Sequence, residues 1–236
     1  MARKRTRSTR KPRSTRTPKR LVLFGAGDIA RLAHVYFASD SKYEVVAFTV
    51  DRDYCKAVTF EGLPLVPFDE VKRRYPPSRH TMFIALSYSQ MNALRTRKYD
   101  EAKALGYTLA SYVSSRCTYL SDHAPGDNCF ILEDNTIQPF VRIGNNVTLW
   151  SGNHIGHDST IDDHCFLASQ IVVSGRVTVG RSCFIGVNAT LRNAITIAPR
   201  SLIGAGAVIM KDTIEGGVYL APQATLGEKR SSEIKL

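Results

Sequence analysis

Aliphatic residues recur at every sixth position through the second half of the chain. From residue 131 to residue 209, all fourteen positions of this series are Ile, Leu or Val, against only ten of the other 65 residues. A helix repeats its apolar face about every 3.6 residues and a strand every second residue, so a period of six fits neither. It is typical of a β-solenoid, whose flat faces each contribute one inward aliphatic side chain. The series is Ile131, Ile137, Ile143, Leu149, Ile155, Ile161, Leu167, Val173, Val179, Ile185, Leu191, Ile197, Ile203 and Ile209.

A second series lies four residues after each aliphatic position. Its members, from Asn135 to Thr213, are small or medium-sized, as expected where the chain turns a corner with the side chain inward. Cys129, Cys165 and Cys183 share this spacing, and we predict that they pack as small apolar residues. The five cysteines show no metal-type spacing, so we expect no structural zinc or disulfide and a reducing, cytoplasmic compartment.

The region before the solenoid follows a different pattern. Apolar runs at 21–24 and 45–50 predict buried strands, and the apolar residues between them recur at helical spacing. Further strands are expected at 63–67, 82–86 and 108–113, and helices at 68–75 and, amphipathic, at roughly 90–105. This alternation is typical of a small βαβ domain with a parallel sheet.

Glycines follow the first of these strands. Gly25 and Gly27 allow a tight turn and a close approach to a ligand, and the following helix start offers N–H groups to a phosphate. Asp51, at the end of the second strand, is placed to accept a hydrogen bond from a ribose or a base edge. The motif indicates a nucleotide site without selecting the nucleotide, and a strand–helix turn without a ligand is the alternative. A dehydrogenase is disfavoured, because about ninety residues are few for a dinucleotide fold and no partner catalytic domain follows.

Charge is concentrated at the N-terminus. The net charge is +11, from 32 basic and 21 acidic residues, and residues 1–20 hold ten of the basic residues and no acidic one. The remainder is nearly neutral, so a nucleic-acid-binding body is disfavoured. The segment 1–20 has no residues that build a core, and we predict a disordered, solvated arm. A tether to an anionic partner is the alternative.

The apolar runs are all short. None approaches the ~18–20 residues of a membrane helix. The basic start is followed by LVLFGAGD, which lacks the apolar segment and small-residue cleavage site of a secretory signal. The sequence therefore predicts neither a transmembrane segment nor secretion.

The hexads IGNNVT, LWSGNH, IGHDST and IDDHCF, over 143–166, carry a family resemblance. They resemble the hexapeptide-repeat acyltransferases, whose fold is a left-handed parallel β-helix with three hexads per coil. A Rossmann-like domain followed by this repeat resembles the NeuD-like sugar acetyltransferase family, and most of all the nucleotide-amino-sugar N-acetyltransferases of the bacillosamine and perosamine type. The resemblance implies α/β plus β-solenoid architecture: a basic tail (1–20), a Rossmann-like nucleotide-sugar-binding domain (21–113), a β-helix acyltransferase domain (114–226) and a C-terminal tail (227–236).

His157 and Asp158 match the catalytic pair of that family, although the family often has Glu where this chain has Asp158. His157 lies two residues after the inward Ile155, so its side chain is expected to point outward. The resemblance implies that His157 is the general base, that Asp158 orients it, and that the N–H of Gly175 stabilises the oxyanion during direct transfer. Of the nearby histidines, His154 is expected to line the same groove, and His164 is expected to be a surface residue.

Matching to the family also assigns binding residues. Acetyl-CoA is expected to contact Phe166 (where the family can carry His), Gly175, Val187 and Ala205. The sugar nucleotide is expected to contact Gly25, Gly27, Asp28, Ile29, Asp51, Arg52 and Ser87, where the family commonly has Gly in place of Ser87. The resemblance further implies a homotrimer with the CoA groove between neighbouring prisms, and no metal.

The predicted function is therefore acetyl-CoA-dependent N-acetylation of a nucleotide-linked amino sugar, a reaction of polysaccharide biosynthesis. The alternatives are O-acetylation of sialic acid or another sugar hydroxyl, and a non-catalytic β-helix scaffold. The residues leave open uridine, guanosine and thymidine diphosphates, the position that is acylated, and an acetyl or longer acyl donor.

Overall fold

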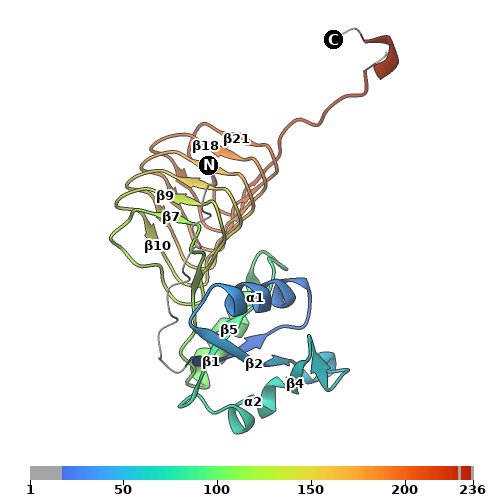
Figure 1. Cartoon of the computed structure of the whole chain (residues 1–236). Helices are drawn as coiled ribbons and strands as arrows, with labels where there is room; N and C mark the ends of the chain where they lie inside the picture. The colour runs from blue at the N-terminus through green and yellow to red at the C-terminus, as the bar shows by residue number, and fades with distance from the viewer. Residues whose placement is uncertain (1–17, 228–229, 235–236) are drawn as a thin grey trace, which may run out of the picture.

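The computed structural model describes residues 18–227 and 230–234. An N-terminal α/β domain is followed by a solenoid of short strands, as Figure 1 shows. Most of the basic arm predicted for residues 1–20, and part of the C-terminal tail predicted for 227–236, lie outside the described residues. No helix among the described residues has the length and apolar character needed to cross a membrane.

The α/β domain is built on one five-stranded sheet. Its strands are β1 (Lys19–Phe24), β2 (Tyr43–Val50), β3 (Thr59–Phe60), β4 (Leu63–Pro67) and β5 (His80–Ile84), in the order β3-β4-β2-β1-β5. All pairs are parallel except β3–β4. Strand β1 is paired on both sides, by β2 and β5, and is buried from Leu21 to Phe24, which explains its unbroken apolar run. The predicted parallel-sheet domain is confirmed, with an antiparallel strand at its edge. The prediction of a further strand of this sheet at 108–113 is wrong: Leu109 makes only an isolated bridge to Met82, and Tyr112–Val113 pairs with Phe130–Ile131 of the solenoid.

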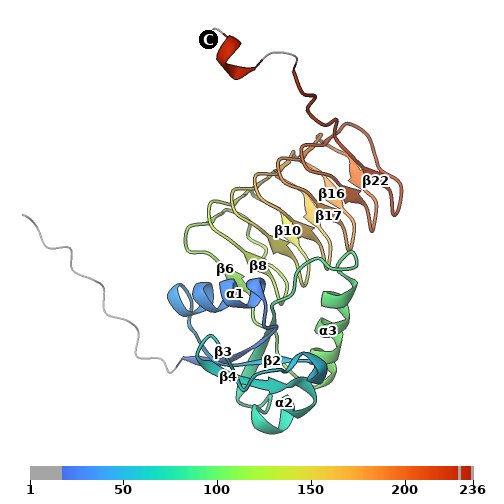
Figure 2. The same cartoon turned by 90° about the vertical axis from the view of Figure 1, so that its right-hand side faces the viewer.

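Three helices and one short 3₁₀ turn complete this domain. They are α1 (Asp28–Ser39), α2 (Phe68–Arg74), α3 (Ala93–Ala104) and η1 (Arg52–Tyr54). In both views α2 lies on the side away from the solenoid, whereas α1 lies on the side toward it (Figures 1 and 2). The strands β1, β2 and β5 end at one edge of the sheet, where parallel α/β sheets bind their ligands.

The solenoid consists of three parallel sheets. Sheet I has the order β22-β20-β17-β14-β11-β8-β6, sheet II the order β21-β18-β15-β12-β9-β7, and sheet III the order β10-β13-β16-β19. Sheet I contains β6 (Tyr112–Val113), β8 (Phe130–Ile131), β11 (Thr148–Leu149), β14 (Phe166–Leu167), β17 (Phe184–Ile185), β20 (Leu202–Ile203) and β22 (Val218–Tyr219). Sheet II contains β7 (Thr118–Tyr119), β9 (Thr136–Ile137), β12 (His154–Ile155), β15 (Val172–Val173), β18 (Thr190–Leu191) and β21 (Val208–Ile209). Sheet III contains β10 (Arg142–Ile143), β13 (Thr160–Ile161), β16 (Thr178–Val179) and β19 (Thr196–Ile197).

Residues 18 apart pair along each sheet, as Ile155 does with Val173, so three hexads make one coil. Every member of the aliphatic series is buried, none exposing more than 7% of its surface. The second series is equally buried, and Cys129, Cys165 and Cys183 are fully enclosed among these side chains. Both sequence predictions are confirmed, and the chain is a parallel β-helix over this region.

Helix α3 joins the two domains through the buried cation Arg95. Its amphipathic pattern was predicted, but its buried residues include Arg95 and Lys98. The guanidinium of Arg95 donates to the carbonyl oxygens of Asn146, His164 and Cys165 on corners of the solenoid. The carbonyls of Asn146 and His164 accept no backbone N–H among the described residues, and that of Cys165 also accepts the N–H of Thr148 on the neighbouring coil. These acceptors allow a buried polar side chain to take the place of an apolar one.

A short η2 turn (Ser231–Glu233) lies near the C-terminus, beyond the last coil (Figure 1).

Candidate active site

His157 lies at the corner of the solenoid that follows β12, with 47% of its side chain exposed. Its Nδ1 lies 2.7 Å from Oδ2 of Asp158, and its backbone N–H donates to Oε1 of Gln138 at 2.8 Å. A carboxylate that accepts a hydrogen bond from Nδ1 leaves Nε2 as the basic nitrogen. The pair therefore has the geometry of a general base with its orienting acid.

The backbone at this corner suits a short acidic residue. Asp158 has φ +59°, in the left-handed region, as have the matching corner positions of the neighbouring hexads. Asp and Asn enter this region more readily than longer side chains, because their polar groups bond locally. The Asp that departs from the family pattern is thus compatible with the local backbone.

Gly175 lies one coil beyond His157, directly against its imidazole. A β-carbon on Gly175 would lie 2.6 Å from Nε2 of His157 and 2.9 Å from its Cε1. Among the hydrogen bonds of the described residues, the N–H of Gly175 has no acceptor. The basic nitrogen and a free backbone donor therefore lie side by side.

An apolar cavity of about 380 Å³ opens between the α/β domain and sheet I. It brings together five of the predicted binding residues: Ile29, Ser87, Phe166, Val187 and Ala205. Ile29 and Ser87, both predicted to contact the sugar nucleotide, therefore line this cavity and are absent from the lining of the second cavity described below, which holds other residues predicted for that ligand.

Three aromatic residues that sequence reasoning did not assign also line this cavity: Tyr88, Trp150 and Phe184. The ring of Tyr88 lies 4.9 Å from that of Phe166 and 4.5 Å from that of Phe184, between centroids. Phe166 and Phe184 are 18 residues apart and stack on neighbouring coils. That spacing is a signal in the sequence that could have identified Phe184.

The Tyr88 loop is fixed to the solenoid at its far end. Gln90, Met91 and Asn92 all have left-handed backbone angles, with φ between 50° and 66°. Asn92 is fully buried and donates to the carbonyl oxygens of Ser182 and Cys183. Its side-chain oxygen accepts a hydrogen bond from Arg95. These bonds offset the backbone strain and hold the loop against the cavity.

A second cavity, of about 400 Å³, lies at the edge of the α/β sheet where β1 and β2 end. Its lining includes the predicted Gly25, Gly27 and Asp51, together with the unpredicted Tyr54 and Arg97. Gly25 has φ +130°, and a β-carbon there would lie 2.6 Å from the carbonyl oxygen of Ala85. A β-carbon on Gly27 would meet nothing within 4 Å. Gly25 is thus required by the turn itself, whereas Gly27 leaves its space open to the cavity.

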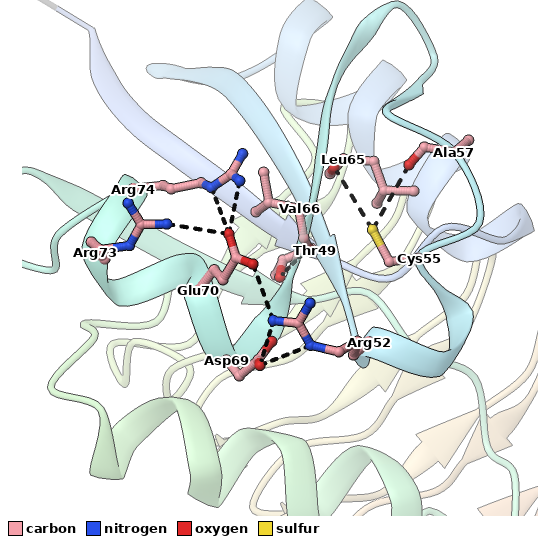
Figure 3. Close-up of polar contacts among 10 residues, drawn as sticks. All are labelled: Thr49, Arg52, Cys55, Ala57, Leu65, Val66, Asp69, Glu70, Arg73 and Arg74. Atoms are coloured by element: carbon pink, nitrogen blue, oxygen red, sulfur yellow. Dashed lines mark hydrogen bonds and ion pairs between the residues drawn. The ribbon is translucent and has the colours of Figure 1, made fainter.

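Two predicted substrate residues point elsewhere. Arg52 binds Oδ2 of Asp69 at 2.7 Å and Oε1 of Glu70 at 3.0 Å, as Figure 3 shows. Asp28, whose side chain is 88% exposed, pairs with Arg31 on the same helix. Neither Asp28 nor Arg52 lines the second cavity. The assignment of these two residues to substrate stays a prediction.

The repeat contains two other histidines, His154 and His164. His154 is half-buried on β12, and the expectation that it lines the same groove remains a prediction. The expectation that His164 is a surface residue is wrong: it is 4% exposed, and its Nδ1 lies 2.9 Å from Nδ2 of Asn146. His164 occupies a left-handed corner covered by helix α3, whose Tyr99 ring lies 5.4 Å away.

The three buried cysteines of the solenoid pack in its apolar core. Burial raises the pKa of the Cys129 thiol to about 12, which disfavours the reactive thiolate. Across the described residues, no three His, Cys, Asp or Glu side chains gather as metal ligands do. The chemistry of the site is best built from His157, Asp158 and backbone groups.

Comparisons with known proteins agree with this architecture. No family model matches the chain. It is 30% identical over 88 residues to UDP-3-O-acylglucosamine N-acyltransferase of Herminiimonas arsenicoxydans, which is 37% of this chain and only 23% of that protein. The chain therefore matches about a quarter of the length of this curated relative.

The solved structures place the fold in a class: an α/β domain followed by a hexapeptide-repeat β-helix, as in sugar N-acetyltransferases. The acetyltransferase domain of PglB from Neisseria gonorrhoeae matches with a TM-score of 0.75 and 22% identity, covering 85% of this chain and 95% of that one. PerB from Caulobacter crescentus, in complex with CoA and GDP-perosamine, matches with a TM-score of 0.73 and 21% identity, covering 84% and 92%. At these identities the likeness establishes the fold, and it confirms the family resemblance at that level.

Proposed function

We propose that the chain is an acetyl-CoA-dependent N-acetyltransferase that acts on the amino group of a nucleotide-linked amino sugar. The observation that carries the proposal is the corner where His157, held by Asp158, lies against Gly175. The cavity beside Gly27 and Asp51 suits a nucleotide, and the cavity beside sheet I is lined by aromatic residues. Two solved structures with this fold are complexes, one with acetyl coenzyme A and the other with CoA and GDP-perosamine.

His157 is the general base of the proposed reaction. Nε2 accepts a proton from the sugar amine as its nitrogen forms a bond to the acetyl carbonyl carbon. Asp158 keeps Nδ1 protonated and stabilises the imidazolium. The N–H of Gly175 donates to the oxyanion of the tetrahedral intermediate. When the carbon–sulfur bond breaks, the proton passes from His157 to the sulfur of CoA, so the enzyme returns to its starting state.

The aromatic cavity and His157 belong to different corners of the solenoid. His157 follows β12 of sheet II, whereas Ala168, Val187 and Ala205 follow strands of sheet I. The family resemblance implies that Val187 and Ala205 contact CoA. A single chain therefore carries these CoA contacts and the general base His157 at different edges of the solenoid. We therefore propose a closed homotrimer in which His157 of one copy faces the cavity of the next.

Product analysis tests this function. The purified protein is incubated with acetyl-CoA and UDP-, GDP- or dTDP-linked amino sugars, and the products are examined by mass spectrometry. We expect one sugar nucleotide to gain one acetyl group that resists hydroxylamine, because amides resist it and esters do not. A hydroxylamine-labile product indicates O-acetylation, and no product with any acceptor supports a scaffold.

A further inference from the structure

Lys98 of helix α3 is a buried lysine that the proposed reaction does not use. Its ammonium lies near the rings of Phe24 and Phe68, 5.5 and 5.3 Å from their centroids. Its side chain is only 7% exposed, and it donates to Asp51 at 2.6 Å and Glu101 at 2.7 Å. Because a buried ammonium is costly unless it is paired, this arrangement ties the carboxylate at the end of β2 to helix α3.

The Lys98 ammonium fixes one oxygen of the carboxylate that faces the second cavity. Asp51 uses Oδ1 for Lys98, and its side chain remains 38% exposed at the cavity. Burial alone would lower the pKa of Lys98, but its hydrogen bonds to Asp51 and Glu101 outweigh burial and raise that pKa. The ammonium therefore stays charged and holds Oδ1 of Asp51 in place, so that the second carboxylate oxygen can accept from a hydroxyl or N–H donor.

Arg97, the preceding residue of α3, supplies the complementary charge. It lines the same cavity as Gly27, and its side chain is 56% exposed. Its Nε lies 3.7 Å from Glu101, and its guanidinium makes no hydrogen bond within the described part of the chain. An Arg with free donors beside an open glycine turn suits the oxygens of a diphosphate.

We propose that helix α3 is part of the nucleotide site: Arg97 pairs with the diphosphate, and Lys98 is a positioning residue that holds Asp51 toward the ribose or base. The ligand class is a nucleoside diphosphate, free or sugar-linked. The inference rests on the proposed function, since it completes the acceptor site of that reaction. Helix α3 then recognises the nucleotide and also carries Arg95, which hydrogen-bonds to the solenoid.

Binding of UDP, GDP and dTDP by calorimetry tests the proposal without requiring turnover. Lys98→Met is compared with wild type, and Lys103→Met is the matched control. Lys103 lies on the same helix as Lys98, but it pairs with Asp127 and does not line this cavity. We expect Lys98→Met to weaken binding of the preferred nucleotide at least tenfold, and Lys103→Met to change that affinity less than twofold. In the enzyme assay, Lys98→Met is expected to raise the KM of the sugar nucleotide while the KM of acetyl-CoA stays unchanged.

Two further variants separate positioning from general structural support. Asp51→Asn and Asp51→Asn/Lys98→Met are expected to bind equally weakly, because Lys98 acts only through Asp51. Arg97→Gln is expected to lose affinity for the diphosphate at least tenfold and to bind the parent nucleoside as wild type does. Folded Lys98→Met that binds within twofold of wild type overturns the proposed role of Lys98, and unchanged diphosphate affinity in Arg97→Gln overturns that of Arg97. If wild type binds no nucleoside diphosphate, the nucleotide part of the proposed function fails as well.

Discussion

The imidazole of His157 rests against the α-carbon of Gly175, so that any β-carbon at position 175 would lie 2.6 Å from Nε2. The two residues are 18 apart and therefore occupy the same corner on successive coils. In the sequence, Gly175 lies two residues after Val173, the same spacing as His157 after Ile155. In the structure, it leaves the space that the base occupies.

Gly175→Ala is expected to displace the His157 ring without unfolding the protein. The clash involves a half-exposed side chain that is free to swing away, so the melting temperature should change by only about 2 °C. Because the base leaves its position, kcat is expected to fall about 100-fold. Gly156→Ala is the contrasting variant: its β-carbon would lie 2.5 Å from the backbone of Ser174, so it should lose stability instead. Thermal unfolding and steady-state rates distinguish the two, and a fully active Gly175→Ala would contradict the account.

Asp158→Asn tests the charge of the orienting acid. Asn tolerates the left-handed backbone at this corner, so the fold and the melting temperature should be preserved. The amide cannot stabilise the imidazolium as a carboxylate does, and kcat is expected to fall about 10- to 100-fold with little change in the KM of acetyl-CoA. Unchanged kcat in Asp158→Asn would remove Asp158 from the mechanism.

The two glycines of the first turn should respond differently to alanine. Gly27→Ala places its methyl group in open space, so the variant should fold normally. Because the methyl group occupies the cavity, binding of the sugar nucleotide should weaken about tenfold. Gly25→Ala meets the carbonyl of Ala85 at φ +130° and should destabilise the domain. Calorimetry with nucleoside diphosphates and thermal unfolding separate the two effects. Normal nucleotide affinity in Gly27→Ala would argue against a ligand at this turn.

Protonation of His164 should couple stability to pH. Burial lowers the pKa of His164 below its ordinary value of 6.5, and Nδ1 accepts a hydrogen bond from Asn146. As the pH falls below 6.5, the unfolded chain takes up a proton that the folded chain resists. The associated stability is therefore complete above 6.5 and is lost below it.

His164→Asn is expected to reduce this acid dependence. Asn fits the left-handed corner and continues the column of Asn128 and Asn146. Urea unfolding at pH 8, 6.5 and 5 should give a shallower loss of stability for the variant than for wild type. Burial also lowers the pKa of His80, which is present in both proteins and cancels in the comparison. Identical pH profiles would show that His164 does not contribute.

The architecture could be predicted from the sequence because the solenoid repeats one physical constraint fourteen times. Every sixth side chain must fill the same narrow interior, and a polar residue at Ile155 or Val173 would have broken the pattern. The glycine turn at Gly25 was equally readable, since only glycine avoids the carbonyl of Ala85. The pair His157–Asp158 required the family resemblance, because a histidine beside an aspartate is common on surfaces.

The remainder of the site depends on contacts between segments that are distant in the sequence. Arg95 is a surface residue by type, and its burial depends on acceptors from distant segments, mainly the carbonyls of the solenoid corners. Tyr88 lines the aromatic cavity because Asn92 anchors its loop more than ninety residues away, at Cys183. Such tertiary pairings leave no periodic trace in the chain.

The most direct test of the central claim is release of CoA thiol from acetyl-CoA, measured with wild type and His157→Asn on the same panel of UDP-, GDP- and dTDP-linked amino sugars. We expect wild type to release thiol only when an amino sugar of the preferred nucleotide is present. We expect His157→Asn to bind acetyl-CoA normally and to lose at least about 100-fold in kcat. Undiminished thiol release by His157→Asn, or wild-type release that is independent of every amine, would contradict the account.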